Sequence, residues 1–339
     1  MLSYGTIISM ITPQLPVQDL INDNLTSEVQ AADAFNTNAK TAVKEIILRH
    51  LIESILKKND KAGVTSGVTI MDLQDQRTLV GRNQDTEHFA ASINKIPVAL
   101  LVLEDLRAGT LDLDQMMTWQ ASDRRAGFGV YDQPGSPLQA PLRDVLFDML
   151  NQSGNTAVRI LVNYGLDGSA AVNARFAAKP QLPHTYLIPL DANRFFLGNS
   201  TTHDSLWAMD QLLKTQDEPG AFIKNALVTN IFTDFGVRSQ LAGNDYIVLA
   251  NKIGLLDDVD GNNRHDVGII YNTKTNKSYG YSFFTTSPFD SPAATPQADQ
   301  SLKDMGRTLL RFSGDRVQEM AEPFMSQRSQ YTPESKILY

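Results

Sequence analysis

The sequence predicts an α/β protein of the α+β kind, in which an antiparallel sheet is flanked by N- and C-terminal helices and an all-helical subdomain is inserted between them. Three observations support this. A helical pattern is followed by strand alternation near the N-terminus, helical patterns fill about 109–240, and strand patterns return from 245 before a last helix. Both ends of the chain are therefore expected to complete one layered unit.

The N-terminal elements are read from the spacing of apolar residues. Segment 39–58 places them at helical intervals, which predicts an amphipathic helix. Residues 63–83 alternate apolar and polar side chains on either side of an Asp-Gln turn, as two antiparallel strands would. Residues 92–107 are apolar nearly all round, so this segment is expected to form a helix buried on every side.

The rest of the chain follows the same logic. Between 109 and 240, helical patterns are separated by Pro- and Gly-bearing loops, notably 122–141 and 179–201. Three strands are then predicted in DYIVLANKIG, RHDVGIIYN and SYGYSFFTTS, and a final helix at about 298–312. We expect an N-terminal leader at 1–38, a folded domain at 39–312 and a C-terminal tail at 313–339.

Composition narrows the function. The chain has 339 residues and a formal net charge of -8, so it offers no basic field for nucleic acid or anionic lipid. The absence of Cys excludes disulfides and thiolate chemistry, and the five His form no metal-binding pattern, so neither a metal nor a cofactor is predicted. No run approaches the ~18–20 apolar residues of a membrane-spanning helix.

The N-terminus gives little evidence of export. Residues 1–20 contain only a short apolar stretch, Ile7 to Ile11, and the first basic residue of the chain is Lys40. A signal peptide has a positively charged start and a longer apolar region. This segment is therefore read as a poor signal peptide, or as a mature or recombinant terminus.

Three short motifs carry the candidate chemistry: Ser92-Ile-Asn-Lys95, Ser153-Gly-Asn155 and Lys252-Ile-Gly254. Each pattern also occurs elsewhere in the chain, for example a second SxxK from Ser54 to Lys57. Ser54 lies within the amphipathic helix that ends in a solvated Lys-Lys pair, whereas Ser92 opens the buried helix. Context therefore favours the pair at 92 and 95.

Ser92 and Lys95 share a helix face, so the amine can reach the hydroxyl. Desolvation at the head of an apolar helix disfavours the ammonium form of Lys95 and allows it to act as a base. The helix N-terminus adds unpaired N–H groups where an oxyanion would develop. The alternative is a capping Ser beside a Lys whose amine reaches solvent.

The other two motifs also have a functional and a structural reading. Ser153 and Asn155 lie at a bend between two strongly apolar helical patterns and face inward as readily as they cap a helix. Lys252 ends a strand, and Gly254 would let a substrate approach the backbone of that strand. The alternative for this third motif is a surface Lys before a turn Gly.

The order SxxK, SxN and KxG resembles that of the class A β-lactamases and penicillin-binding proteins. The stretch GSPLQAPLRDVLFDMLNQSGNTAVRILV is also similar to the family's segment around its second motif, and the resemblance covers roughly 40–312. It implies that 39–312 is a β-lactamase-like catalytic domain with a serine nucleophile. It also implies an exported protein.

The resemblance assigns a role to each motif residue. Ser92 would attack an amide carbonyl to form an acyl-enzyme, Lys95 would accept its proton, and Ser153 would relay a proton to the leaving nitrogen. Asn155 would hold Lys95 and the substrate. Lys252 would supply positive charge to Ser153 and to a substrate carboxylate.

Further contacts follow from the same resemblance. Ile253 and Gly254 would border the substrate, and Arg264 would clamp its carboxylate. The backbone N–H groups of Ser92 and Leu255 would form the oxyanion hole. From the sequence itself, Tyr131 and Phe128 in the 122–141 loop are candidates to stack on a ligand, with local packing as the alternative.

The chain departs from the family pattern in three places. Ile253 replaces a hydroxyl residue that binds the substrate carboxylate, and Gly154 replaces the Asp of S-D-N. Class A enzymes carry a Glu in the loop before the position of Ser200, and an Asn four residues after that Glu. If Asn193 matches the Asn, Pro189 stands at the position of the Glu. No Glu occurs between 109 and 217, and Asp191 is the nearest carboxylate, with a turn former as its alternative.

The sequence thus predicts a metal-free serine acyl-transfer hydrolase that acts on β-lactams or D-alanyl cell-wall peptides and releases its acyl group slowly. Its partner would be that small-molecule substrate rather than nucleic acid, and the oligomeric state is left open. Two alternatives remain. One is a catalytically silent binding module of the cell envelope, and the other is an esterase for unrelated acyl groups.

Overall fold

The computed structural model describes residues 37–191, 194–258, 261–291, 293–316 and 319–320. The predicted leader and tail therefore lie largely outside the described residues. The chain divides into two compact units, a larger one at Ile55–Arg307 and a smaller one formed by 1–54 with 308–339. The boundary falls inside the first and last helices of the described chain, α3 (Thr37–Lys61) and α10 (Ala294–Ser313).

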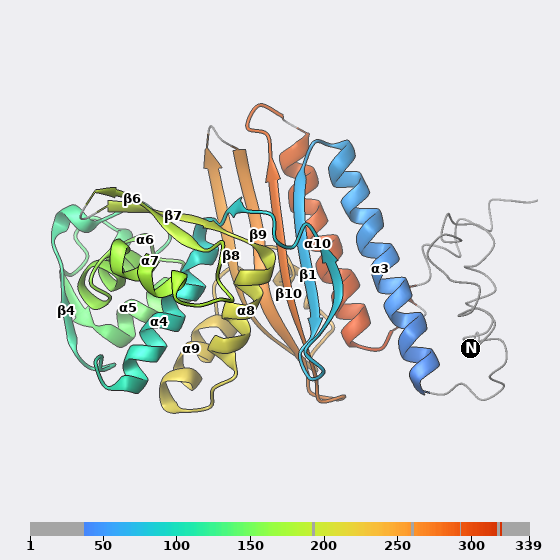
Figure 1. Cartoon of the computed structure of the whole chain (residues 1–339), viewed down its shortest axis with the longest axis horizontal. Coiled ribbons are helices and arrows are strands. Elements are labelled where there is room, and N and C mark those ends of the chain that lie inside the picture. Colours follow the sequence, from blue (N-terminus) through green and yellow to red (C-terminus); the bar gives the residue numbers. More distant parts are fainter. Residues whose placement is uncertain (1–36, 192–193, 259–260, 292, 317–318, 321–339) are drawn as a thin grey trace, which may run out of the picture. The chain divides into compact units, whose positions relative to one another are not determined.

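A five-stranded antiparallel sheet organises the larger unit, in the order β2-β1-β10-β9-β8 (Figure 1). Its strands are β1 (Thr65–Asp72), β2 (Arg77–Arg82), β8 (Ile247–Asp258), β9 (Gly261–Asn272) and β10 (Lys277–Ser287). The pairing of β1 with β10 joins the N-terminal hairpin to the three C-terminal strands. The predicted hairpin, the three late strands and their closure into one sheet are confirmed.

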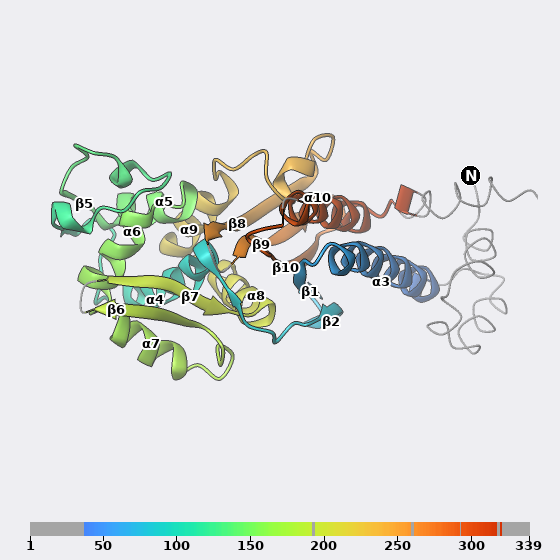
Figure 2. The same cartoon turned by 90° about the horizontal axis from the view of Figure 1, so that it is seen from above.

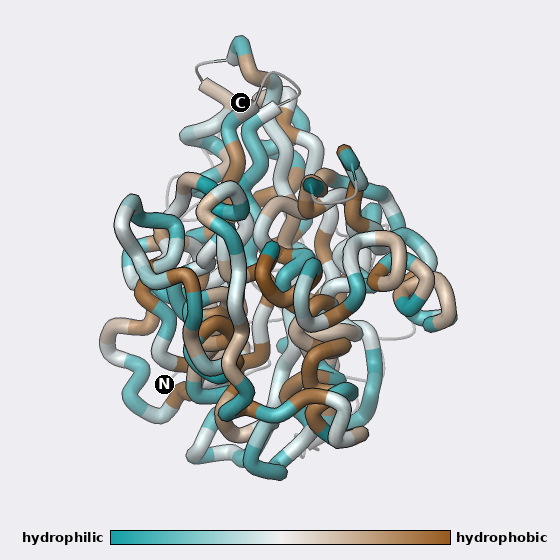
Figure 3. Tube along the Cα trace, turned by 90° about the vertical axis from the view of Figure 1, so that its left-hand side faces the viewer, coloured by the Kyte–Doolittle hydropathy of each residue, from teal (hydrophilic) through white to brown (hydrophobic). Residues whose placement is uncertain are grey.

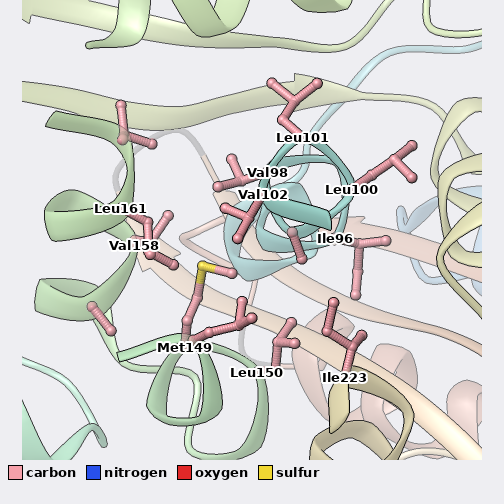
Figure 4. Close-up of a cluster of buried hydrophobic side chains, with 14 of the residues drawn as sticks. Ile96, Val98, Leu100, Leu101, Val102, Met149, Leu150, Val158, Leu161 and Ile223 are labelled. Atoms are coloured by element: carbon pink, nitrogen blue, oxygen red, sulfur yellow. The ribbon is translucent and has the colours of Figure 1, made fainter. Parts of the chain in front are cut away.

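The central helix starts beside this sheet, where its leading turn contacts β8 and β9, and it is built as the sequence predicted. A 3-10 turn, η1 (Ala91–Asn94), leads into α4 (Lys95–Ala108), whose residues 95–103 are all buried. Pro97 falls in the first turn, where it removes no helical hydrogen bond. Gly109 ends the helix at a φ of +71°, a conformation that glycine adopts without a steric penalty. Figure 4 shows α4 surrounded by apolar side chains from its neighbours.

Helices α8 (Thr202–Leu213) and α9 (Glu218–Val228) pack against strands of the sheet and against α4. Thr201 and Asp217 cap these two helices by accepting hydrogen bonds from the backbone N–H groups of Asp204 and Gly220. The remaining helical segments are α5 (Leu142–Asn151), α6 (Asn155–Ile160), η4 (Leu161–Gly165), α7 (Ser169–Ala177), η2 (Ala121–Asp123), η3 (Val130–Asp132) and η5 (Arg238–Gln240). Figure 3 shows hydrophobic stretches alternating with hydrophilic ones along this trace.

The inserted subdomain is not entirely helical, which corrects one part of the prediction. Strand β4 (Met116–Thr118) pairs with β5 (Gln139–Pro141), and β6 (Tyr186–Asp191) pairs with β7 (Arg194–Ser200), which also pairs with the short β3 (His88–Phe89). Pro189 and Gly198 concealed the second hairpin in the sequence. Both belong to a pairing with register shifts, where an irregular backbone accommodates them.

The other face of the sheet is covered by the first part of α10, on the side opposite α8 (Figure 2). Within the larger unit, Asn59 Nδ2 donates to Ser66 Oγ at 2.9 Å and Ser301 Oγ at 3.1 Å, which ties the end of α3 to β1 and α10. In the smaller unit, Lys44 pairs with Asp315 at 3.0 Å. None of the helices in the described part of the chain is long and apolar enough to cross a membrane.

Candidate active site

The predicted nucleophile and base lie one helical turn apart at the start of the central helix. Ser92 is half-buried within η1, and Lys95, the first residue of α4, is completely buried. The Lys95 Nζ to Ser92 Oγ distance is 3.0 Å. Ala91, just before the serine, has a φ of +46°, so a strained backbone turns the chain into the helix at this point.

The surroundings of Lys95 favour a neutral amine. Its Nζ lies 2.6 Å from the carbonyl oxygen of Ser153 and 2.8 Å from Asn155 Oδ1, and both atoms can only accept. An ammonium would donate to these two acceptors and to Ser92 Oγ, whereas a neutral amine can donate to the two acceptors and turn its lone pair toward the Ser92 hydroxyl. Burial lowers the pKa of Lys95 to about 7, against the opposing effect of the Asp132 and Asp148 carboxylates.

The second motif faces the same amine. Ser153 is buried at the turn between α5 and α6 with a φ of +60°, a left-handed conformation that non-glycine residues rarely adopt. Its Oγ lies 3.2 Å from Lys95 Nζ and accepts from Lys252 Nζ at 2.8 Å. Ser153 therefore bridges two buried lysines.

Lys252 comes from β8 and is also fully buried. Besides Ser153, it donates to the carbonyl oxygen of Ile253 at 3.0 Å, and the ring of Phe232 lies 5.7 Å from its Nζ. Burial lowers the pKa of Lys252 well below its usual range, and the nearby positive charge of Lys95 lowers it further. An unbroken series of polar contacts thus runs from Ser92 through Lys95 and Ser153 to Lys252.

Asn155 and Asp132 hold the second motif in place. Asn155 accepts from Lys95 through Oδ1 and donates through Nδ2 to the carbonyl oxygen of Ala126 at 2.7 Å. Asp132 accepts from the backbone N–H groups of Asn155 at 3.1 Å and Thr156 at 2.7 Å, which satisfies the first turn of α6. The 122–141 loop is therefore fastened to the motif by backbone and side-chain contacts.

Asn94 and Gly254 bring two further elements against η1. Asn94 Nδ2 donates to the carbonyl oxygens of Tyr186 and Asn199 and makes a short contact with that of Leu197, which anchors the β6–β7 hairpin beside Ser92. A Cβ at Gly254 would lie 2.9 Å from the carbonyl oxygen of Ala90. The absent side chain at 254 therefore lets β8 approach η1 closely.

These elements enclose a cleft of about 590 Å³ that opens onto the nucleophile. We call it the Ser92 cleft. Among the predicted site residues, the cleft is lined by Ser92, Ser153, Asn155, Ile253 and Leu255. Lys95 and Lys252 lie directly behind this lining, in contact with Ser153. The volume is in the range of small-molecule binding sites.

Gly254 is not part of this lining, and the predicted residues Arg264, Tyr131 and Asp191 also lie outside it. Arg264 pairs with Asp257 at 2.5 Å and Asp299 at 3.1 Å and lines a neighbouring hollow. Tyr131 is buried in an edge contact with Trp119, the local packing that was its alternative. Asp191 is exposed at the end of β6 and forms an ion pair with Arg194, and its predicted neighbour Asn193 lies outside the described residues.

Other residues of the site escaped the sequence reasoning. Asp132 and Asp148 lie near Lys95, and Phe232 lies in the cleft lining, where it meets the predicted candidate Phe128 edge to face at 5.5 Å. Asp148 could have been singled out from the sequence, because it is a charged residue inside the apolar pattern LRDVLFDMLNQ. Phe232 and the β6–β7 hairpin had no comparable signal, because their role depends on contacts far apart in the sequence.

Solved structures with the same fold include β-lactamases and a penicillin-binding protein. A β-lactamase from Sphaerobacter thermophilus aligns with a TM-score of 0.65 at 22% identity, over 78% of this chain and 97% of that one. One from Burkholderia vietnamiensis gives 0.66 at 17% identity, over 79% and 96%. PBP-A gives 0.66 at 15% identity, over 77% and 95%. At these identities the likeness defines the fold class.

The family follows from the sequence itself. The model of the β-lactamase enzyme family matches residues 47–312, so this chain belongs to that family. At the family level it is a serine hydrolase of the β-lactamase type. Comparison with curated protein sequences gives no significant match.

Proposed function

We propose that this protein is a serine acyl-transfer hydrolase that forms an acyl-enzyme on Ser92, with β-lactams or D-alanyl cell-wall peptides as substrates. The contact between Lys95 Nζ and Ser92 Oγ carries this proposal, because it joins a half-buried hydroxyl in a cleft to an amine whose pKa burial lowers to about 7. Such substrates would place the protein outside the cytoplasm.

In the proposed acylation, Ser92 Oγ attacks the substrate carbonyl carbon while its proton moves to Lys95 Nζ. The backbone N–H groups of Ser92 and Leu255 hold the oxyanion. The carbon–nitrogen bond then breaks, and the Ser153 hydroxyl gives its proton to the leaving nitrogen while it takes up the proton held by Lys95 Nζ, 3.2 Å away. Lys252 Nζ, 2.8 Å from Ser153 Oγ, supports that transfer by donating toward the oxygen.

We further propose that deacylation is slow. Hydrolysis of the acyl-enzyme needs a base that activates a water beside the ester. Pro189 stands where the family pattern has a Glu. The nearby Asp191 is exposed, pairs with Arg194 and is not part of the cleft lining.

The test is the mass of the intact protein during incubation with excess benzylpenicillin, followed over hours and after removal of free drug. We expect one covalent adduct that persists, and we expect none in Ser92→Ala. Ser54→Ala is the matched control, since Ser54 belongs to the other SxxK pattern and lies exposed on α3. Rapid turnover of a chromogenic cephalosporin would contradict slow deacylation.

The alternative, a catalytically silent binding module, makes the opposite forecast for the same experiment. If the unmodified protein gains no adduct from penicillins, peptides or activated esters, the acyl-transfer proposal is wrong and the silent module is supported. The buried lysines weigh against that alternative, because burying two amines costs stability that a purely structural role does not require.

A further inference from the structure

The Ser92 cleft has an apolar wall that the proposed acyl transfer does not itself require. The wall consists of Val158 from α6, Leu190, Phe195 and Phe196 from the β6–β7 hairpin, and Leu255 and Leu256 from β8. Leu190 is 48% exposed and Phe196 is 50% exposed. Large apolar side chains left in contact with water around a concave site indicate a surface that is covered when a ligand binds.

The charged groups of the cleft do not interrupt this wall. Arg159 is buried in an ion pair with Asp123 at 3.0 Å, and Arg194 is paired with Asp191. Arg125 donates to the carbonyl oxygens of Ser122 and Arg124. Each of these guanidinium groups has a partner within the protein, so the wall between the hairpin and β8 offers contact to hydrocarbon.

The position of the wall identifies which half of the substrate it receives. Ser153 and Lys252 mark the side where the leaving group takes up its proton. The hairpin is fastened beside η1 by Asn94 and contributes nothing to that proton path. The part of the substrate that stays bonded to Ser92 after the leaving group departs is the acyl group, and it is the part that can extend toward the hairpin.

We propose that the Ser92 cleft selects substrates with a large apolar acyl group, which packs between the β6–β7 hairpin and the end of β8. The inference rests on the proposed acyl transfer and specifies its substrate class. Burial of a methylene group contributes about 0.8 kcal/mol in transfer between water and an apolar site. The acylation rate constant should therefore rise about twofold to fourfold for each methylene that the wall covers.

The experiment uses p-nitrophenyl esters of acetic, butanoic and hexanoic acid, which share one leaving group. In each case Ser92 Oγ bonds to the acyl carbon, p-nitrophenolate departs and is measured by absorbance, and the serine proton passes to Lys95. We expect kcat/KM to increase along the series in the unmodified protein. We also expect the hexanoate-to-acetate ratio to fall in Phe196→Ser and to stay unchanged in Phe289→Ser.

Phe289 is the matched control because it is 57% exposed and lies outside the cleft lining. A flat or falling series with activity that still depends on Ser92 overturns the apolar acyl preference and leaves the acyl-transfer function standing. An unchanged ratio in Phe196→Ser also overturns the preference. Loss of Ser92 dependence for all three esters and for benzylpenicillin overturns the acyl-transfer function itself.

A separate observation concerns the missing Asp of the second motif. Gly154 leaves a space that Asp148 fills from α5, since a Cβ at position 154 would collide with Asp148 Oδ2. Asp148 Oδ1 accepts from the backbone N–H of Val130 at 2.7 Å, and Oδ2 has no partner among the described residues. The carboxylate is 3% exposed and lies between the 122–141 loop and the turn that carries Ser153.

We infer that Asp148 supplies the carboxylate that the S-D-N pattern places in the middle of the second motif, and so acts as a positioning residue for Ser153 and Asn155. Gly154 has a φ of -53° and ψ of 124°, which any residue can adopt. The backbone therefore does not require a glycine at this position, whereas the collision of a Cβ with Asp148 Oδ2 does. Asp148 and Gly154 are therefore expected to depend on each other energetically.

The test is a mutant cycle. Asp148→Ala should lower the acylation rate by about tenfold or more, because the Val130 N–H loses its buried acceptor. Gly154→Asp alone should also lower it through the collision, whereas the double variant should regain most of the loss. A double variant no more active than Asp148→Ala overturns the inference.

A pH profile distinguishes positioning from a general loss of stability. Asp148, Asp132 and Lys252 are the charged groups that act on Lys95, and Asp148 raises the pKa of Lys95. Asp148→Asn keeps the shape but removes the charge, so the rise of acylation with pH should move to lower pH. An unchanged profile in Asp148→Asn contradicts the coupling to Lys95.

Discussion

The pH dependence of acylation follows directly from the burial of Lys95. The ordinary pKa of a lysine is 10.5, and burial lowers that of Lys95 to about 7. The difference corresponds to about 5 kcal/mol that disfavours the ammonium form. At pH 7 about half of the molecules would hold a neutral amine, against well under 0.1% for an unperturbed lysine.

The rate of acylation should therefore increase with pH through the pKa of Lys95. At pH 5 only about 1% of Lys95 would be neutral, so the rate constant should rise about a hundredfold between pH 5 and pH 9 and level off above about pH 8. The assay is the rate of labelling by a fluorescent penicillin under pseudo-first-order conditions at each pH. Lys95→Arg, which stays charged, should label very slowly at every pH.

Two results would refute this reasoning. A rate constant that keeps increasing up to pH 10 would mean that Lys95 has an ordinary pKa in spite of its burial. A flat profile between pH 5 and pH 9 would mean that the amine is not the base. Stability at each pH must be measured alongside, so that unfolding is not mistaken for loss of the base.

Three further outcomes are expected. Ile253→Thr should restore a hydroxyl beside Lys252 and speed labelling by carboxylate-bearing β-lactams relative to neutral esters, measured as the ratio of the two rate constants. Gly254→Ala should lower the free energy of unfolding by about 1–3 kcal/mol in a denaturant titration, because the added methyl group meets Ala90 and Ile93 at 2.9 Å. Gly165→Ala is the control and should cost less, since the nearest atom to its methyl group is 3.7 Å away. Lys95→Met should raise the free energy of unfolding, and most at low pH, for example at pH 6. The pKa of Lys95 is lower in the folded than in the unfolded state, so the cost of the buried ammonium is fully present below about pH 7 and fades toward pH 10. A stabilisation that grows with pH would contradict this.

Much of the fold could be predicted because the patterns were local and unbroken. The all-apolar helix that begins at Lys95, the N-terminal hairpin and the three late strands each have one clear periodicity. The β6–β7 hairpin did not, since Pro189 and Gly198 break its alternation and its pairing tolerates register shifts. A Pro or Gly residue is as typical of a loop as of an irregular strand, so the sequence pattern cannot distinguish the two.

The part of the site that belongs to the three sequence motifs could be predicted. The structure joins Ser92, Lys95, Ser153, Asn155 and Lys252 in one connected series of contacts, as the order of the motifs suggested, although their roles stay predictions. Arg264 and Tyr131 could not be placed from sequence. Arg264 has two carboxylates within reach that lie 7 and 35 positions away in the chain, and neither pairing has a local pattern.

The most direct test of the account is the location of the covalent bond. After labelling with benzylpenicillin, the protein is digested and the modified peptide is sequenced by tandem mass spectrometry. We expect the adduct on Ser92 alone, in the unmodified protein and in Ser54→Ala. An adduct on any other residue, or one that persists in Ser92→Ala, would contradict the claim that Ser92 is the nucleophile.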